Sequence, residues 1–181
     1  MKWKTLDSKL IYKNPWLSLR EDKIVHPNGK SGIYSVVDIA PGIFTVALTE
    51  NNEIYMVREL RYTTGINSWE LPGGGQKEGE KSIQTAKKEL LEEAGLVANR
   101  WFHVGQSQAL NGSSSQIDQV FIAKGLSRKK GKKEKKEGIG AVRKFKVSRI
   151  VEMIKKGDIS DGQALAHLTM ALLYLGYDFK R

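Results

Sequence analysis

The feature that most restricts the fold is a change of hydrophobic period at the run Leu71-Pro72-Gly73-Gly74-Gly75. Up to this run the apolar residues follow patterns typical of strands, whereas from Lys81 to Ala94 they recur at helical spacing. The apolar stripe of this expected helix consists of Ile83, Ala86, Leu90 and Ala94. Gly95 suits the left-handed residue that ends a helix. We therefore expect a glycine-rich bend that leads into an amphipathic helix.

The remaining elements indicate a mixed α/β architecture. The segment 3–60 has short β-rich runs separated by turn signals, as in a meander of strands. Further expected elements are strands over 101–104, 119–123 and 142–147 and helices over 148–156 and about 161–175. Because strands and helices are interleaved, we predict a mixed sheet covered by helices, in one domain over 1–181.

The composition excludes several kinds of site. The chain has no cysteine, which removes disulfides, thiolate metal sites and cysteine nucleophiles. The first residues lack the apolar core of a secretory signal, and no stretch approaches the ~20 apolar residues of a membrane span. We therefore expect a cytoplasmic protein without a membrane partner.

The net charge of +10 raises the question of nucleic-acid binding. Between Arg128 and Glu137, seven basic and two acidic residues give a local charge of +5. This stretch has no aromatic residue on which a base could stack, so we interpret it as a solvated loop. A nucleic-acid-binding segment is the alternative, but nucleic acid is not the expected partner.

Three glutamates on the expected helix form the densest chemical signal. Glu89, Glu92 and Glu93 are spaced three and four residues apart and therefore lie close together on the helix surface, at the edge of its apolar stripe. Magnesium prefers oxygen ligands and would relieve the repulsion between these carboxylates. The alternative is a solvated face paired with Lys87 and Lys88. The preceding glycine run, which lets backbone approach a ligand, favours the metal site.

The pattern Gly74-x5-Glu80-x7-Lys88-Glu89-Leu90-x-Glu92-Glu93-x-Gly95-Leu96 resembles the signature of the Nudix hydrolase family over 23 residues. One position differs, because the family has arginine where this chain has Lys88. A lysine keeps the charge but loses the planar, bidentate geometry of the guanidinium, which predicts a working but slower site.

The resemblance implies an α/β/α sandwich that cleaves a pyrophosphate bond with Mg²⁺, or with Mn²⁺ in its place. It implies Glu89, Glu92, Glu93 and the carbonyl of Gly73 as metal ligands, with Glu92 and Glu93 also catalytic. Gly74 is expected to contact the substrate.

The segments 57–62 and 69–74 further resemble the branch of ADP-ribose pyrophosphatases and nucleoside diphosphate sugar hydrolases. This resemblance implies that Arg61 contacts the diphosphate, with Arg58 as a second contact, and that Glu70 helps to hold the site. A strand-edge ion pair with Glu59 or Glu70 is the alternative for both arginines.

Other implied features lie outside these segments. Trp16 matches an aromatic residue that stacks on the base, with a core tryptophan as the alternative. Glu137 matches the catalytic base, with Glu134 as a substitute and a solubilising acid as the alternative. The branch also implies a homodimer formed through N-terminal strands within 1–42, followed by a catalytic core over 43–181. We expect His103 and His167 to be structural.

The predicted reaction is magnesium-dependent hydrolysis of nucleoside diphosphate sugars, either ADP-ribose or hexose conjugates, to a nucleoside monophosphate and a sugar phosphate. A Nudix hydrolase directed at RNA ends and a catalytically weak nucleotide-sensing module are the alternatives.

Overall fold

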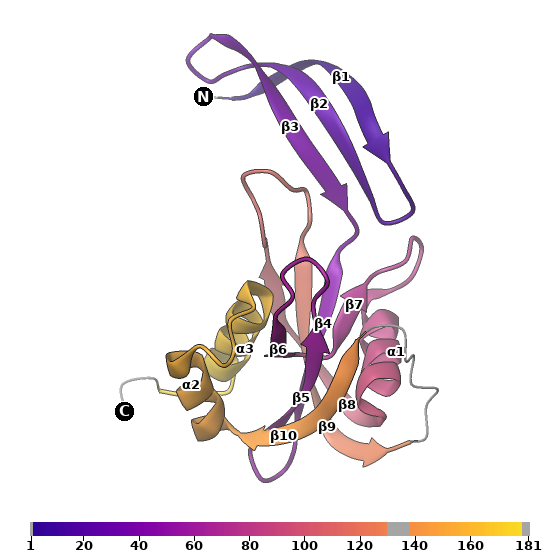
Figure 1. Cartoon of the computed structure of the whole chain (residues 1–181), viewed down its shortest axis with the longest axis vertical. Coiled ribbons are helices and arrows are strands. Elements are labelled where there is room, and N and C mark those ends of the chain that lie inside the picture. The colour runs from indigo at the N-terminus through magenta and orange to yellow at the C-terminus, as the bar shows by residue number, and fades with distance from the viewer. Residues whose placement is uncertain (1, 130–137, 179–181) are drawn as a thin grey trace. The chain divides into compact units, whose positions relative to one another are not determined.

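The computed structural model describes residues 2–129 and 138–178, and within them the chain forms ten strands and three helices (Figure 1). The strands are β1 (Lys4–Lys13), β2 (Leu17–Val25), β3 (Ser31–Ile39), β4 (Gly42–Leu48), β5 (Glu53–Leu60), β6 (Asn67–Glu70), β7 (Gly73–Gly75), β8 (Leu96–Ser107), β9 (Asp118–Arg128) and β10 (Ile139–Lys146). The helices are α1 (Ser82–Ala94), α2 (Val147–Lys156) and α3 (Gly162–Tyr174). Two compact units result: Met1–Pro41 with Gln108–Ile117, and Gly42–Ser107 with Asp118–Arg181.

The first unit is an antiparallel sheet with the order β1-β2-β3. Its strands include the expected N-terminal β segments. The polar segment expected as a loop near residue 111 joins this unit, because the amide of Val37 donates to the carbonyl of Ser113 at 2.8 Å. The hydroxyl of Tyr34 also donates to the carbonyl of Gly112 at 2.6 Å.

The second unit contains a mixed sheet, which in the described residues has the order β10-β5-β4-β9-β8, with β6 beside β5 and β7 beside β4. Strands β4 and β9 run parallel, and the remaining pairs are antiparallel. Helix α1 covers one face of this sheet, and α2 and α3 cover the other (Figure 1). The predicted α/β/α sandwich is confirmed.

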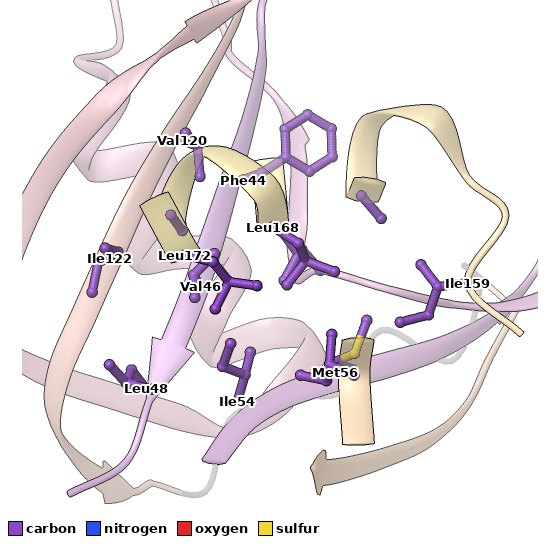
Figure 2. Packing of buried hydrophobic residues seen from close by; sticks show 14 of the residues in the cluster. Phe44, Val46, Leu48, Ile54, Met56, Val120, Ile122, Ile159, Leu168 and Leu172 are labelled. Atoms are coloured by element: carbon purple, nitrogen blue, oxygen red, sulfur yellow. The ribbon is translucent and has the colours of Figure 1, made fainter. Parts of the chain in front are cut away.

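The core fills both sides of the central strands. All residues of β4 are buried, as expected for a strand covered on both faces. The larger apolar cluster lies between the sheet and helices α2 and α3, and Figure 2 shows Val46, Ile54 and Leu168 within it. A smaller cluster under α1 includes Leu90 and Leu96. The described helices contain no segment long and apolar enough to cross a membrane.

The glycine run differs from its expectation. Instead of a bend, Gly73–Gly75 forms strand β7, which pairs antiparallel with β4. A Cβ atom at Gly73 would lie 2.6 Å from the carbonyl oxygen of Ile43 and 2.7 Å from the ring of Phe44. The run can pair with the buried strand because glycine lacks this atom.

Candidate active site

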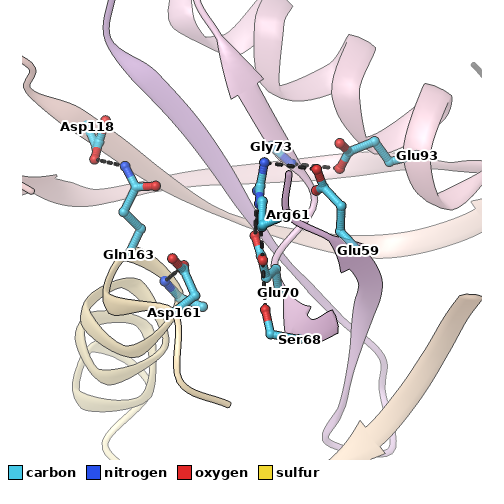
Figure 3. A network of polar contacts seen from close by, with 10 residues as sticks. Glu59, Arg61, Ser68, Glu70, Gly73, Glu93, Asp118, Asp161 and Gln163 are labelled. Carbon is cyan, nitrogen blue, oxygen red and sulfur yellow. Dashed lines mark hydrogen bonds and ion pairs between the residues drawn. The ribbon is translucent and has the colours of Figure 1, made fainter. Parts of the chain in front are cut away.

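Strand β7 and helix α1 bring the glutamates against the sheet. A Cβ atom at Gly74 would lie 2.9 Å from the carboxyl carbon of Glu89, so the absence of a side chain there lets the carboxylate approach the backbone. The backbone amide of Gly73 donates to Oε2 of Glu93 at 2.9 Å (Figure 3). Residue 73 therefore fixes one glutamate by a hydrogen bond, and residue 74 makes room for another.

Glu89 and Glu93 are 7% and 6% exposed, whereas Glu92 is less buried. Desolvation disfavours charged carboxylates unless a cation or donors compensate. Lys88 provides part of this compensation: its Nζ lies 2.8 Å from Oε1 of Glu89 and 3.7 Å from Oε2 of Glu92. The hydrogen bond to Glu89 and the surrounding acids raise the pKa of Lys88 against the opposing effect of burial.

Glu80 strengthens the start of the helix. The hydroxyl of Thr85 donates to its carboxylate at 2.8 Å. The side-chain oxygen of Gln84 accepts from the amide of Lys81 at 3.0 Å, as a residue in the first turn of a helix often does. These contacts hold the first turn of α1 beside the segment that follows β7.

Arg61 forms the second part of the site, just beyond the end of β5. Its Nε lies 3.1 and 3.2 Å from the two carboxylate oxygens of Glu70, and its Nη1 lies 2.9 Å from Oε1 of Glu59 (Figure 3). The hydroxyl of Ser68 donates to Oε1 of Glu70 at 2.7 Å. Burial opposes the charge of Arg61, but the hydrogen bonds and charge of Glu70 outweigh it and raise the pKa of the guanidinium. The ion pairs with Glu59 and Glu70, which were the alternative considered for Arg61, are both present.

Two contributors were not identified from the sequence. Ser68 fixes Glu70, and its spacing of two residues on one strand is the only signal that could have indicated this. Asp161 caps α3 by accepting from the amide of Ala164 at 2.7 Å. Burial raises the pKa of its carboxyl; the charge of Glu70 acts in the same direction, against the hydrogen bond from Ala164 and the charge of Arg61. The sequence predicted a helix that begins near Asp161, but it did not predict that Asp161 lies close to this network.

Some predicted residues cannot be assigned to this network. Arg58 pairs with Trp69 across the β5–β6 ladder, on the face of the hairpin opposite Glu59 and Ser68. Trp16 belongs to the first unit and is 77% exposed, so the core alternative for this residue is wrong. Glu134 and Glu137 lie outside the described residues.

The donors present suit a hard cation. Among the described residues no three acidic or imidazole side chains converge as a preformed metal site. However, Mg²⁺ commonly takes only one or two carboxylates together with substrate phosphates. The nearly buried pair Glu89 and Glu93, beside the backbone of Gly73, fits that requirement. The ammonium of Lys88 next to Glu89 shows that a positive charge is stabilised at this position.

Comparison with known families decides the identity. A model of the NUDIX domain matches residues 39–168, and a model of the nucleoside diphosphate sugar hydrolase N-terminal domain matches residues 3–37. The chain belongs to the Nudix hydrolase family.

Relatives of this Nudix chain include two ADP-ribose pyrophosphatases. The protein from Mycobacterium tuberculosis is 29% identical over 91% of this chain and 80% of its own length. The protein from Bacillus subtilis is 28% identical over 72% of this chain and 71% of its own length. A crystal structure of an ADP compounds hydrolase superposes with a TM-score of 0.85 at 15% identity, covering 97% of this chain and 95% of that one, and so supports the fold. The predicted family and branch are confirmed.

Proposed function

We propose that this Nudix hydrolase cleaves the pyrophosphate bond of nucleoside diphosphate sugars, ADP-ribose or hexose conjugates, giving a nucleoside monophosphate and a sugar phosphate. The observation that carries the proposal is the pair of nearly buried carboxylates, Glu89 and Glu93, held against the glycine strand within the matched NUDIX domain. The match of the N-terminal segment to a nucleoside diphosphate sugar hydrolase model and the two ADP-ribose pyrophosphatase relatives support the substrate class.

In this proposal Mg²⁺, replaceable by Mn²⁺, is held by Glu89, Glu93, Glu92 and the carbonyl of Gly73, and supplies charge neutralisation on the diphosphate oxygens. The chain's own groups perform the remaining tasks. The amide of Gly73 fixes the orientation of the Glu93 carboxylate. The absence of a side chain at Gly74 lets the Glu89 carboxylate lie close to the backbone, and Gly74 is proposed to contact the substrate.

Arg61 is proposed to bind the diphosphate. Its side chain is 47% exposed although two carboxylates hold it, so its guanidinium is positioned while part of it still faces solvent. A guanidinium held in this way offers paired donors to phosphate oxygens with little loss of rotamer freedom on binding. Glu70, fixed by Ser68, sets the direction of that arginine. The catalytic base is proposed to be Glu137.

Product analysis tests the reaction. Purified protein incubated with ADP-ribose and a panel of nucleoside diphosphate hexoses, with MgCl₂ or MnCl₂, should release a nucleoside monophosphate and a sugar phosphate in equal amounts. Folded protein that turns over none of these compounds with either metal would reject the proposal. Release of inorganic phosphate from 5′-triphosphorylated RNA instead would favour the RNA-directed alternative.

We also propose that the chain is a cytoplasmic homodimer formed through its N-terminal unit. Every residue of β1 is exposed in the single chain, and the first unit presents large apolar side chains at Trp3, Leu6, Leu10 and Ile33. Large apolar side chains exposed on a sheet are typical of an association surface. A second copy of the chain is the proposed partner.

A further inference from the structure

A cavity of about 400 Å³ lies beside strand β6 and the turn between α2 and α3. Its walls include Arg58 and Trp69, which face each other across the β5–β6 ladder. Trp69 packs with the apolar cluster beneath α2 and α3. Because side chains alternate between the two faces of a strand, Glu59 points to the face opposite Arg58. Ser68, whose hydroxyl donates to Glu70, also lines the cavity, so the cavity borders the candidate active site.

Part of the cavity lining is suited to an anion. The guanidinium carbon of Arg58 lies 5.9 Å from the centre of the Trp69 ring. The edge of Phe145, with ring centroids 4.9 Å apart and an interplanar angle of 78°, holds the indole in place. Within residues 2–129 and 138–178 the guanidinium of Arg58 makes no hydrogen bond or ion pair. Its N–H groups are therefore available to a ligand, and their planar arrangement matches phosphate oxygens.

Other lining residues are suited to hydroxyl groups. Asp158 and Ser160, from the turn after α2, line the wall, and Asn67 lines it from β6. A carboxylate such as that of Asp158 only accepts hydrogen bonds, so it favours hydroxyl donors and repels a second anion. A volume of this size suits a small ligand rather than a dinucleotide. The complementary molecule carries both a phosphate group and hydroxyl groups.

We infer that this cavity is a second ligand site for a small phosphomonoester of a polyol, such as a sugar phosphate. Its walls adjoin the active-site network directly: Arg58 precedes Glu59, and Ser160 precedes the α3 cap Asp161. A ligand that bridges β6 and the α2–α3 turn would restrain both segments, which gives it a route to modulate the adjoining site. The binding itself does not depend on the proposed reaction.

Isothermal titration calorimetry with ribose 5-phosphate, in EDTA to prevent metal-dependent binding, tests the inference. Wild-type protein should bind one equivalent per chain. The substitution Arg58→Gln should weaken binding by about tenfold or more, since it removes the charge that pairs with phosphate. The matched substitution Arg61→Gln, three residues away on the active-site network, should leave binding within about twofold of wild type. Circular dichroism establishes that both variants are folded.

The substitution Asp158→Asn provides a second, independent readout. Removing the carboxylate should reduce the preference for ribose 5-phosphate over inorganic phosphate, because it weakens hydroxyl recognition and relieves repulsion of the anion. The absence of wild-type binding would overturn the inference. Loss of binding in Arg61→Gln, with retention in Arg58→Gln, would also overturn it, by assigning the ligand to the glutamate face. These outcomes do not bear on turnover, so a failure here is distinct from a failure of the proposed function.

Discussion

Lys88 lies between two carboxylates of the helix, where the family signature has arginine. Its single ammonium reaches Glu89 at 2.8 Å and Glu92 only at 3.7 Å, so it orients one carboxylate well and the other weakly. A guanidinium could donate to both at once, because its N–H groups form a planar fork. At the scale of single residues, the quality of the site depends on how firmly these carboxylates are held.

The substitution Lys88→Arg should therefore raise kcat, by up to about tenfold, which corresponds to about 1.4 kcal/mol of transition-state stabilisation. Steady-state kinetics on the best substrate of the panel, at saturating MgCl₂, provide the measurement. If both the wild type and this variant bind nucleotide sugar but neither turns it over, the sensing alternative is favoured over the enzyme.

The substitution Glu93→Gln should reduce turnover by about 100-fold or more, since even groups that only support metal ligands contribute about 10- to 100-fold. The fold should persist, because glutamine has nearly the same shape and its amide oxygen can still accept from the amide of Gly73. The exposed Glu152 on α2 offers a control, and Glu152→Gln should retain wild-type rates. Equal rates in both variants would contradict the role of Glu93.

At the scale of elements, the position of β7 against α1 explains the need for glycine. The substitution Gly74→Ala places a methyl group 2.9 Å from the Glu89 carboxyl carbon and should lower kcat/KM by about tenfold or more, because small displacements of catalytic groups are costly. The neighbouring Gly75→Ala places its methyl group in open space, since no heavy atom lies within 4 Å, and should be nearly neutral. Parallel activity and melting measurements on the two variants check this. Equal losses would mean that strand formation, not the contact with Glu89, is responsible.

Helix α3 carries a buried titratable group that gives a pH dependence of stability. His167 is fully buried, its Nε2 lies 2.8 Å from the hydroxyl of Ser107, and its ring packs on Phe44 with centroids 4.5 Å apart. Its Nδ1 has no partner within the described residues. Burial lowers the pKa of His167, although the charge of Asp118 acts in the opposite direction. The folded state therefore favours the neutral ring.

As the pH falls, His167 is protonated in the unfolded state before it is protonated in the folded state. The contribution of the neutral His167 to folding stability is therefore complete above the unfolded pKa of about 6.5, and it is lost as the pH falls below that value toward the folded pKa. Melting temperatures of the wild type should drop between pH 7.5 and 5.5 by more than those of His167→Gln. The same comparison with His103→Gln, at an exposed position of β8, controls for a general effect of histidine removal. A pH response of His167→Gln equal to that of the wild type would contradict the assignment.

At the scale of the whole molecule, the exposed apolar side chains of the first unit predict self-association. Light scattering coupled to size exclusion should give twice the chain mass of 20.3 kDa. The substitution Leu10→Asp on β1 should shift the protein toward the monomer, because it places a charge in an apolar interface. Lys9→Asp, at the neighbouring exposed position, controls for the added acid. A monomeric wild type at micromolar concentration would exclude the proposed homodimer.

Most of the elements, and the glutamate helix among them, could be predicted from the sequence. The helix predicted over 81–94 is α1, because a 3.6-residue apolar period and a terminal Gly95 are local properties of the chain. The spacing of Glu89 and Glu93 placed both carboxylates near one another for the same reason. Strand β7 escaped prediction, because its pairing with β4 depends on residues about 30 positions away in sequence, and glycine has little strand preference of its own.

The contacts between charged groups could be known only from the tertiary structure. The sequence assigned Arg58 and Arg61 the same alternatives. In the structure the guanidinium carbon of Arg58 lies 5.9 Å from the centre of the Trp69 ring, whereas Arg61, beyond the end of β5, is held by Glu59 and Glu70. The approach of Asp161 to that network likewise arises from the packing of α3 on the sheet. The periodicity of a helix or strand depends on neighbouring residues and can be read from the sequence. Contacts between distant segments form only when the apolar core holds the sheet and the helices together.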